Sequence, residues 1–369
     1  AGERRLLHEE VGSALEHLYG EGRDRIAVHL AYHFDQAGKA REAIEYGLQA
    51  GDHALLAGAS DEATRYYQRV LQQLGEVDLG DRGTSLRMRA LKGLGRLCKQ
   101  AGRYPQSEAY LREAIAFGIE LGQDPQDLAF LSFWLGEALC WQGKWDEMRL
   151  VGEEGLARIG GDSESVGMAL MHYTIAMALG GACSTDRARA LTRRTARFLR
   201  DLPYVEELGY AYYQCMQLCQ HEDDIEGARM WLAARAERAE EHGDLPGLVS
   251  VASDAAFLAQ GTGDLRAAIA QRQSFLDAVT RAGNISDRGW SLVNLAELFL
   301  YSGDLDRATL CFEESLPLSE ALGYREGVAY SREFEGITAL CRGNWDVAIT
   351  AFLEAKPSCR LTHDSFGSN

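Results

Sequence analysis

The sequence predicts an all-α fold, a right-handed α–α superhelix of about eight or nine helical hairpins. Two observations predict this fold. The first is a period of forty residues in the second half of the chain, marked by Gly143, Cys183, Asp223, Gly263, Gly303 and Gly343. The second is an alanine five residues after five of these marks, at Ala188, Ala228, Ala268, Ala308 and Ala348. Such a period indicates one pair of helices repeated along the chain, each pair burying its apolar face against its neighbours.

Each repeat is expected to contain a helix, a tight turn and a second helix, as residues 127–158 illustrate. Leu128, Leu131 and Leu135 recur at intervals of three and four, the period of an α-helix. Gly143 then ends the first helix, where a left-handed conformation is needed. The repeat length accommodates two helices of roughly fifteen to seventeen residues and two short turns. Later repeats are expected to begin near Gly167, Glu207, Gly247, Asp287 and Gly327.

The regular array is expected to occupy only part of the chain. Residues 1–74 predict an irregular amino-terminal helical cap with the first repeats, because the early turn glycines are unevenly spaced. Residues 75–85 are polar and glycine-rich, and predict a linker. Residues 86–356 hold the solenoid, and residues 357–369 predict a tail without regular structure.

Composition narrows the class of protein. Apolar residues make up 46% of the chain, enough for a continuous core, and only six prolines interrupt it. The net charge of −17 argues against binding of nucleic acid by this segment and against binding to anionic membranes. The chain has neither an apolar run of roughly eighteen residues nor the pattern of a signal peptide, so we expect a cytoplasmic protein. Because it begins at Ala1 rather than at methionine, we expect a piece of a longer product.

Histidine patterns offer little support for catalysis. His29 and His33 have the spacing of two metal ligands on one helix, with Asp35 close by. Leu30, however, stands where a metalloprotease needs glutamate, so structural packing is the preferred interpretation. Neither a phosphate loop nor a nucleophile elbow occurs in the sequence. We therefore expect no enzyme activity, no bound metal and no cofactor.

Cysteines are expected to be reduced and structural. Six of the eight lie within helical apolar patterns, and we expect them to be small buried hydrophobic side chains: Cys98, Cys140, Cys215, Cys219, Cys311 and Cys341. Two of these cysteines and His221, which follows them, have the appearance of three metal ligands. Because the two thiols occupy positions where other repeats carry core leucines, a place in the core is the preferred interpretation.

Several repeats follow a motif with a small residue in the first helix, a glycine at the turn, an aromatic residue two later and an alanine five later, and the first of them has Ser107 in place of that alanine. The matching residues are Gly95, Gly102, Tyr104 and Ser107, then Leu135, Gly136, Gly143 and Trp145, then Leu295, Ala296, Gly303 and Ala308. This pattern resembles the tetratricopeptide repeat in its longer form of about forty residues. The resemblance covers about residues 27–356 and implies the fold, whereas function depends on the surface that such a scaffold presents.

The amino-terminal segment carries a second resemblance. LLHEEVGSALEHLYG, followed by AVHLAYHFDQAGKAREAIEYGLQAGDHALLAGASDEATRYYQRVL, resembles the stretch that follows the ATPase and winged-helix modules of bacterial signal-transduction ATPases of the maltose-activator type. That family includes transcription regulators and adenylate cyclases. The resemblance implies that the array is a non-catalytic sensor arm, which binds a protein partner, a peptide or a small inducer. The alternative is a free-standing adaptor that binds a peptide.

In a superhelix of this family, the first helix of each repeat lines the concave surface. Every third or fourth residue of these helices is then expected to point into a groove that grips a peptide, a partner helix or a small apolar ligand. The expected aromatic lining comprises Phe130, Phe133, Trp134, Trp141, Tyr173, Tyr210, Tyr213, Trp290, Tyr301 and Tyr330. The alternative is that these rings are buried between repeats.

Two rows of basic residues are further candidates. Arg89, Lys92, Arg96 and Lys99 share one helical face, which could clamp a carboxylate or a phosphate. The alternative for this row is a solvated helix face. A second row comprises Arg189, Arg193, Arg197 and Arg200, with Arg187 and Arg194 nearby. For this second row we prefer salt bridges at the surface, with partners expected among Glu206, Glu207, Glu237, Glu240 and Glu241. The alternative is that the row docks an acidic partner domain.

Overall fold

The computed structural model of the chain describes residues 2–77, 79–160, 164–181 and 183–363, with side chains described as far as residue 355. Within these ranges the backbone forms helices and turns and no strand. The chain divides into two compact units. Unit 1 comprises residues 1–99 and 105–124, and unit 2 comprises residues 100–104 and 125–369.

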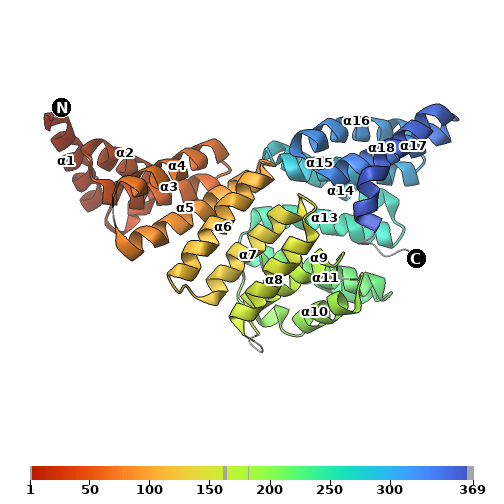
Figure 1. Cartoon of the computed structure of the whole chain (residues 1–369), viewed down its shortest axis with the longest axis horizontal. Helices are drawn as coiled ribbons and strands as arrows, with labels where there is room; N and C mark the ends of the chain where they lie inside the picture. The colour runs from red at the N-terminus through yellow and green to blue at the C-terminus, as the bar shows by residue number, and fades with distance from the viewer. Residues whose placement is uncertain (1, 78, 161–163, 182, 364–369) are drawn as a thin grey trace. The chain divides into compact units, whose positions relative to one another are not determined.

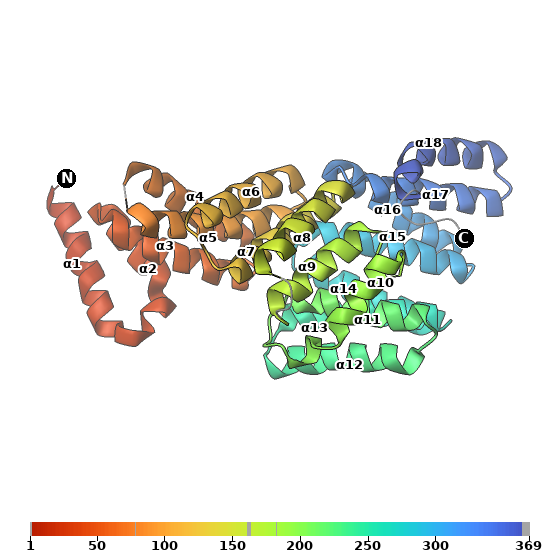
Figure 2. The same ribbon diagram turned by 60° about the horizontal axis from the view of Figure 1, so that its bottom comes forward.

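The helices follow one another in antiparallel pairs, and both ribbon views show them in order (Figures 1 and 2). The first helices are α1 (Gly2–Tyr19), a 3-10 helix (Gly20–Ile26), α2 (Ala27–Ala37), α3 (Ala40–Leu56), α4 (Ser60–Glu76), α5 (Gly80–Gln100) and α6 (Tyr104–Glu120). The next are α7 (Pro125–Cys140), α8 (Trp145–Ile159), α9 (Val166–Ala178), α10 (Asp186–Ala196), a 3-10 helix (Leu199–Asp201), α11 (Leu208–His221) and α12 (Ile225–Glu241). The last are α13 (Leu245–Gly261), α14 (Leu265–Arg281), α15 (Ile285–Tyr301), α16 (Leu305–Leu322), α17 (Arg325–Cys341) and α18 (Trp345–His363).

The predicted repeats are confirmed. In unit 2 the first helices of successive repeats start within two residues of the expected positions, at Val166, Leu208, Leu245, Ile285 and Arg325. The periodic alanines lie where first and second helices touch, since Ala188, Ala228, Ala268 and Ala308 have no exposed surface. A larger side chain would not fit there, which explains why alanine recurs at this position.

The turn between the two helices of a repeat requires a left-handed backbone conformation. Gly263 and Gly303 take it with φ of 82° and 78°. Asp223 holds the same place in its repeat and has φ of 57°, as the one non-glycine residue with positive φ in the described part of the chain. At Cys183 the chain differs, because the positive φ values fall on the preceding Gly180 and Gly181, and α9 ends early at Ala178.

Two predicted boundaries differ from the structure. The connection after α4 is shorter than the linker expected at residues 75–85, because α5 begins at Gly80. Gly83 is buried, and a Cβ there would lie 3.0 Å from the Leu79 side chain, so this glycine permits close packing. At the other end, α18 continues to His363, past the start of the expected tail at residue 357. Residues 364–369 of that tail lie outside the described residues.

Within unit 2, residues distant in sequence meet at the ends of the first helices. The Tyr104 hydroxyl donates to Ser286 Oγ over 2.8 Å. The Tyr104 ring stacks on Trp141, which in turn contacts the Tyr324 ring with centroids 4.8 Å apart. These contacts connect Tyr104 and the turn before α8 to the amino-terminal ends of α15 and α17. No helix in the described part of the chain combines the length and the apolar character needed to cross a membrane.

Candidate functional site

In unit 2, the first helix of each repeat has one row of partly exposed side chains. α9 contacts α11, α11 contacts α13, and α15 contacts α17. We define the first-helix face as Tyr210, Tyr213, Gln217 and Gln220 on α11, Ser250, Ser253, Phe257 and Gln260 on α13, Trp290, Glu297 and Tyr301 on α15, and Tyr330, Glu333 and Ile337 on α17. All are half-buried except Tyr301, which is 60% exposed.

Side-chain contacts join α11 to α13 in the first-helix face, and others order side chains within one helix. The rings of Tyr213 on α11 and Phe257 on α13 lie with centroids 5.6 Å apart, and Gln217 donates to the Tyr213 hydroxyl over 2.8 Å. On α15 the Tyr301 hydroxyl donates to Glu297 Oε1 over 2.8 Å. This hydrogen bond, burial, and the charges of Glu297 and Glu333 raise the pKa of Tyr301 to about 12. Both glutamates therefore act on one hydroxyl at the join of α15 and α17.

Three of the predicted groove aromatics belong instead to the core. Phe133 has no exposed surface, and Tyr173 and Trp134 are 5% and 8% exposed. The Tyr173 hydroxyl donates to buried Glu137 over 2.9 Å, and Trp134 Nε1 donates to buried Glu207 over 3.1 Å. For these three rings the alternative interpretation, burial between repeats, describes the structure.

The other predicted aromatics keep some exposure. Phe130, Trp141, Tyr210, Tyr213, Trp290 and Tyr330 are half-buried. Tyr210 has its ring against the buried cluster, with centroids 5.2 Å from Phe133 and 5.3 Å from Tyr173. The half-buried rings can therefore contact a ligand while their inner edges stay packed against the core.

A charged layer that the sequence did not indicate as a site lies beneath the first-helix face. Arg272 on α14 has no exposed surface, donates to Ser253 Oγ over 2.7 Å and lies 4.4 Å from the centre of the Phe257 ring. Burial lowers its pKa to about 10. Beside it, buried Asp254 pairs with Arg235 of α12. The forty-residue period could have revealed this buried charge, because Arg272 occupies the position at which the next repeat has the apolar Phe312.

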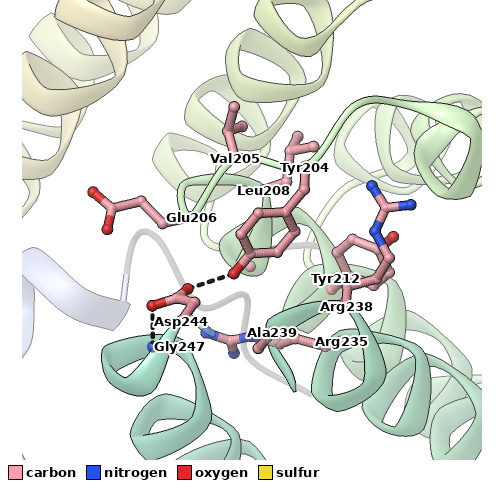
Figure 3. Close-up of a pocket in the computed structure, with 11 residues that line it drawn as sticks. Tyr204, Val205, Glu206, Leu208, Tyr212, Arg235, Arg238, Ala239, Asp244 and Gly247 are labelled. Carbon is pink, nitrogen blue, oxygen red and sulfur yellow. Dashed lines mark hydrogen bonds between the residues drawn. The ribbon is translucent and has the colours of Figure 1, made fainter. Parts of the chain in front are cut away.

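A small pocket lies among the loop before α11, the end of α12 and the start of α13 (Figure 3). Its polar groups are largely engaged with one another. Tyr204 donates to Asp244, which also accepts from the Gly247 N–H over 2.9 Å (Figure 3). Arg238 donates to the Leu202 carbonyl over 2.6 Å. Burial and the bond to Asp244 raise the pKa of Tyr204. The pocket is thus a packed joint between helices, and we do not place a ligand in it.

The first basic row lies on α5 of unit 1 and does not form an open clamp. Arg89 pairs with Asp52 of α3, with Nη2 and Oδ2 2.7 Å apart. Lys92 and Arg96 are half-buried, and Lys99 is only 6% exposed. The four cations therefore differ in their access to solvent, although they share one side of the helix.

The second basic row is interrupted and uses other partners than expected. α10 ends at Ala196, so Arg197 and Arg200 do not continue its face. Arg187 pairs with Glu153 over 2.8 Å, and Arg193 pairs with Glu222. Surface salt bridges were expected for this row and are present, but none of these partners is among the glutamates named from the sequence.

The cysteine and histidine patterns have structural surroundings. Cys215 is 2% exposed, and burial raises its pKa, so its thiol stays protonated. Cys341 is exposed, contrary to the expected burial, because it is the last residue of α17. Asp35 accepts from Arg69 and Gln73, while His33 Nδ1 lies 3.1 Å from His8 Nδ1. Among the described residues, no three His, Cys, Asp or Glu side chains are grouped as metal ligands.

No family model and no curated protein matches the chain. Solved structures do match its fold. The structure of a Rap protein complexed with Competence and Sporulation Factor has a TM-score of 0.59 and 14% identity, over 97% of this chain and 99% of that one. The Rap conjugation gene regulator of plasmid pLS20, in complex with the Phr* peptide, has a TM-score of 0.58 and 13% identity, over 92% and 79%.

A third match is a signal-transduction ATPase with numerous domains and a tetratricopeptide repeat sensor, from Pyrococcus horikoshii. Its TM-score is 0.52 with 12% identity, over 99% of this chain and 55% of that one. At such identities the three likenesses show the fold alone. They agree with the helical-hairpin solenoid that the forty-residue period predicts.

Proposed function

We propose that this chain is a non-catalytic binding protein, which senses a peptide or a protein partner through the first-helix face. The observation that carries the proposal is the run of half-buried rings and amides from Tyr210 on α11 to Ile337 on α17. Rings that are half-buried can lose further apolar surface on binding, and amides such as Gln217 and Gln260 can pair with the backbone of an extended chain.

The similar structures support a peptide as the ligand. One of the two Rap structures is a complex with Competence and Sporulation Factor, and the other is a complex with the Phr* peptide. A small inducer is the alternative ligand, and it would have to bind between the same rings.

We further propose that the array serves as the sensor arm of a bacterial signal-transduction ATPase or transcription regulator in the cytoplasm. The match to a longer ATPase with a repeat sensor supports this context. A free-standing adaptor is the second candidate, supported by a match that covers 99% of a Rap chain. Reading the native coding frame upstream of residue 1 separates the two: a phosphate loop and winged helix support the arm, and a nearby start codon supports the adaptor.

The binding proposal is tested with the full chain on an array of random octapeptides, followed by fluorescence anisotropy with those that bind. We expect a subset to bind, and the double variant Tyr210→Ala/Tyr213→Ala to bind them at least about tenfold more weakly. Leu310→Ala is the matched control, because Leu310 is 64% exposed on the second helix α16.

Circular dichroism monitors the fold of each variant. Unchanged helicity with weakened binding supports the proposal. Failure of every peptide to bind, or equal binding by the wild type and the double variant, contradicts it. A large loss of cooperative unfolding in the double variant would show instead that Tyr210 and Tyr213 act as core residues.

A further inference from the structure

The first-helix face has a distinctive charge. Its residues, from Tyr210 to Ile337 as defined above, include the carboxylates of Glu297 and Glu333 and no lysine or arginine. The two glutamates are half-buried, and neither forms an ion pair with any residue that the structure describes. Two cations lie beneath the face. Arg272 is fully buried, is engaged with Ser253 and interacts electrostatically with Glu297, and Arg235 pairs with buried Asp254.

The two carboxylates lie on neighbouring helices. Glu297 accepts a hydrogen bond from the Tyr301 hydroxyl, and Glu333 acts electrostatically on the same hydroxyl. The Tyr301 bond occupies part of the hydrogen-bonding capacity of Glu297, since each carboxylate oxygen can accept more than one bond. Both glutamates thus retain acceptor sites for a ligand that donates.

Aromatic rings accompany the carboxylates on the same face. Tyr301 is 60% exposed, and Trp290 and Tyr330 are half-buried on the same helices as Glu297 and Glu333. Guanidinium and ammonium groups are attracted both to carboxylates and to aromatic faces, and a planar guanidinium can use both at once. An anionic side chain placed there would meet two like charges.

We infer that the ligand of the first-helix face is a cationic peptide, with an arginine or lysine side chain held by Glu297 and Glu333 beside Tyr301. This inference rests on the proposed function and specifies its ligand. Charge complementarity favours a basic ligand, because the part of the face formed by α15 and α17 attracts a basic side chain. The rings and amides of α11 and α13 then contact the rest of the peptide.

The test uses three acetylated, amidated and labelled octapeptide pools with the full chain. The pools share random uncharged flanks and differ at one central position, which is arginine, citrulline or glutamate. Citrulline has the shape of arginine without its charge. We expect the arginine pool to bind about tenfold more tightly than the citrulline pool, and the glutamate pool to bind most weakly.

Two variants locate the preference. Glu297→Gln/Glu333→Gln is expected to bind the arginine and citrulline pools equally. An acidic chain attracts any cation, so the matched control removes equal charge elsewhere: Glu237→Gln/Glu241→Gln, both exposed on α12, is expected to keep the preference. If the double variant does not fold, two measurements still test the inference. One is binding of the pools by Glu333→Gln alone, and the other is the difference between the arginine and citrulline pools on the wild-type protein.

The possible failures are distinct. If the wild type binds the arginine and citrulline pools equally, or prefers glutamate, the inference is overturned while the proposed function stands. If the control variant loses the preference as fully as the Glu297 and Glu333 variant, the attraction comes from net charge and the assigned site is wrong. If no pool binds at all, the proposed function itself fails.

Discussion

Replacing Glu326 by glutamine is expected to stabilise the protein above pH 7 and to remove a pH dependence that the wild type has. Glu326 lies on α17, only 9% exposed. Burial raises its pKa from 4.5 to about 7, although a hydrogen bond from the Trp145 side chain acts in the opposite direction. Glutamine keeps the shape and the acceptor for Trp145 without the charge.

The sign and size follow from the two pKa values of Glu326. Below pH 4.5 the Glu326 carboxyl is protonated in both the folded and the unfolded chain. The free energy of unfolding is then at its full value, because no charge is buried. Between pH 4.5 and about 7 only the folded chain retains the proton, so the free energy of unfolding falls as pH rises. The difference, 7 − 4.5, at about 1.4 kcal/mol per pH unit, gives a loss of about 3 kcal/mol that is complete above pH 7.

The assay is urea denaturation at pH 5, 6, 7 and 8, followed by tryptophan fluorescence, on wild type, Glu326→Gln and Glu313→Gln. Glu313 is exposed on α16 and serves as the matched control. Between pH 5 and 8 the stability advantage of Glu326→Gln over wild type should grow by about 2–3 kcal/mol. Parallel pH profiles for wild type and Glu326→Gln would refute the reasoning.

Three further predictions test the packing of the two units. Phe133→Ala empties a fully buried site and should lower the free energy of unfolding by about 3–5 kcal/mol, whereas Leu310→Ala should change it by less than about 0.5 kcal/mol, both by urea denaturation. Gly93→Ala should destabilise unit 1 by about 1–3 kcal/mol, seen as a lower melting temperature, because the new Cβ would lie 2.4 Å from the Tyr67 ring. Asp244→Ala should cost about 1–2 kcal/mol by removing the amino-terminal cap of α13, and Asp244→Asn, which can still cap, should restore most of it; equal loss in both would contradict this explanation.

The forty-residue period predicts most of the helices and turns of the fold. It marked Asp223, which is not a glycine, as equivalent to the turn glycines, and Asp223 has their left-handed conformation. It could not foresee the repeat at Cys183, where two earlier glycines let the first helix end sooner. Local glycine content competes there with the period, and spacing alone does not show which one determines the turn.

The candidate site was less predictable, because exposure depends on neighbours that are distant in sequence. Phe133 and Tyr213 occupy the same position in their repeats, yet one is fully buried and the other half-buried. Phe133 is surrounded by the rings of Trp134, Tyr173 and Tyr210. Sequence spacing gives the side of a helix on which a residue lies, but not how many side chains cover it.

The most direct measurement of the central claim is photo-crosslinking of the full chain with an arginine-pool octapeptide that carries a photoreactive group. Mass spectrometry then identifies the labelled segments. We predict labels on the first helices, at Tyr210–Gln220, Trp290–Tyr301 and Tyr330–Ile337, and their loss when excess unlabelled peptide competes. Labels confined to the second helices α12, α14 and α16, or labels that competition does not reduce, would contradict the claim that the first-helix face binds peptide.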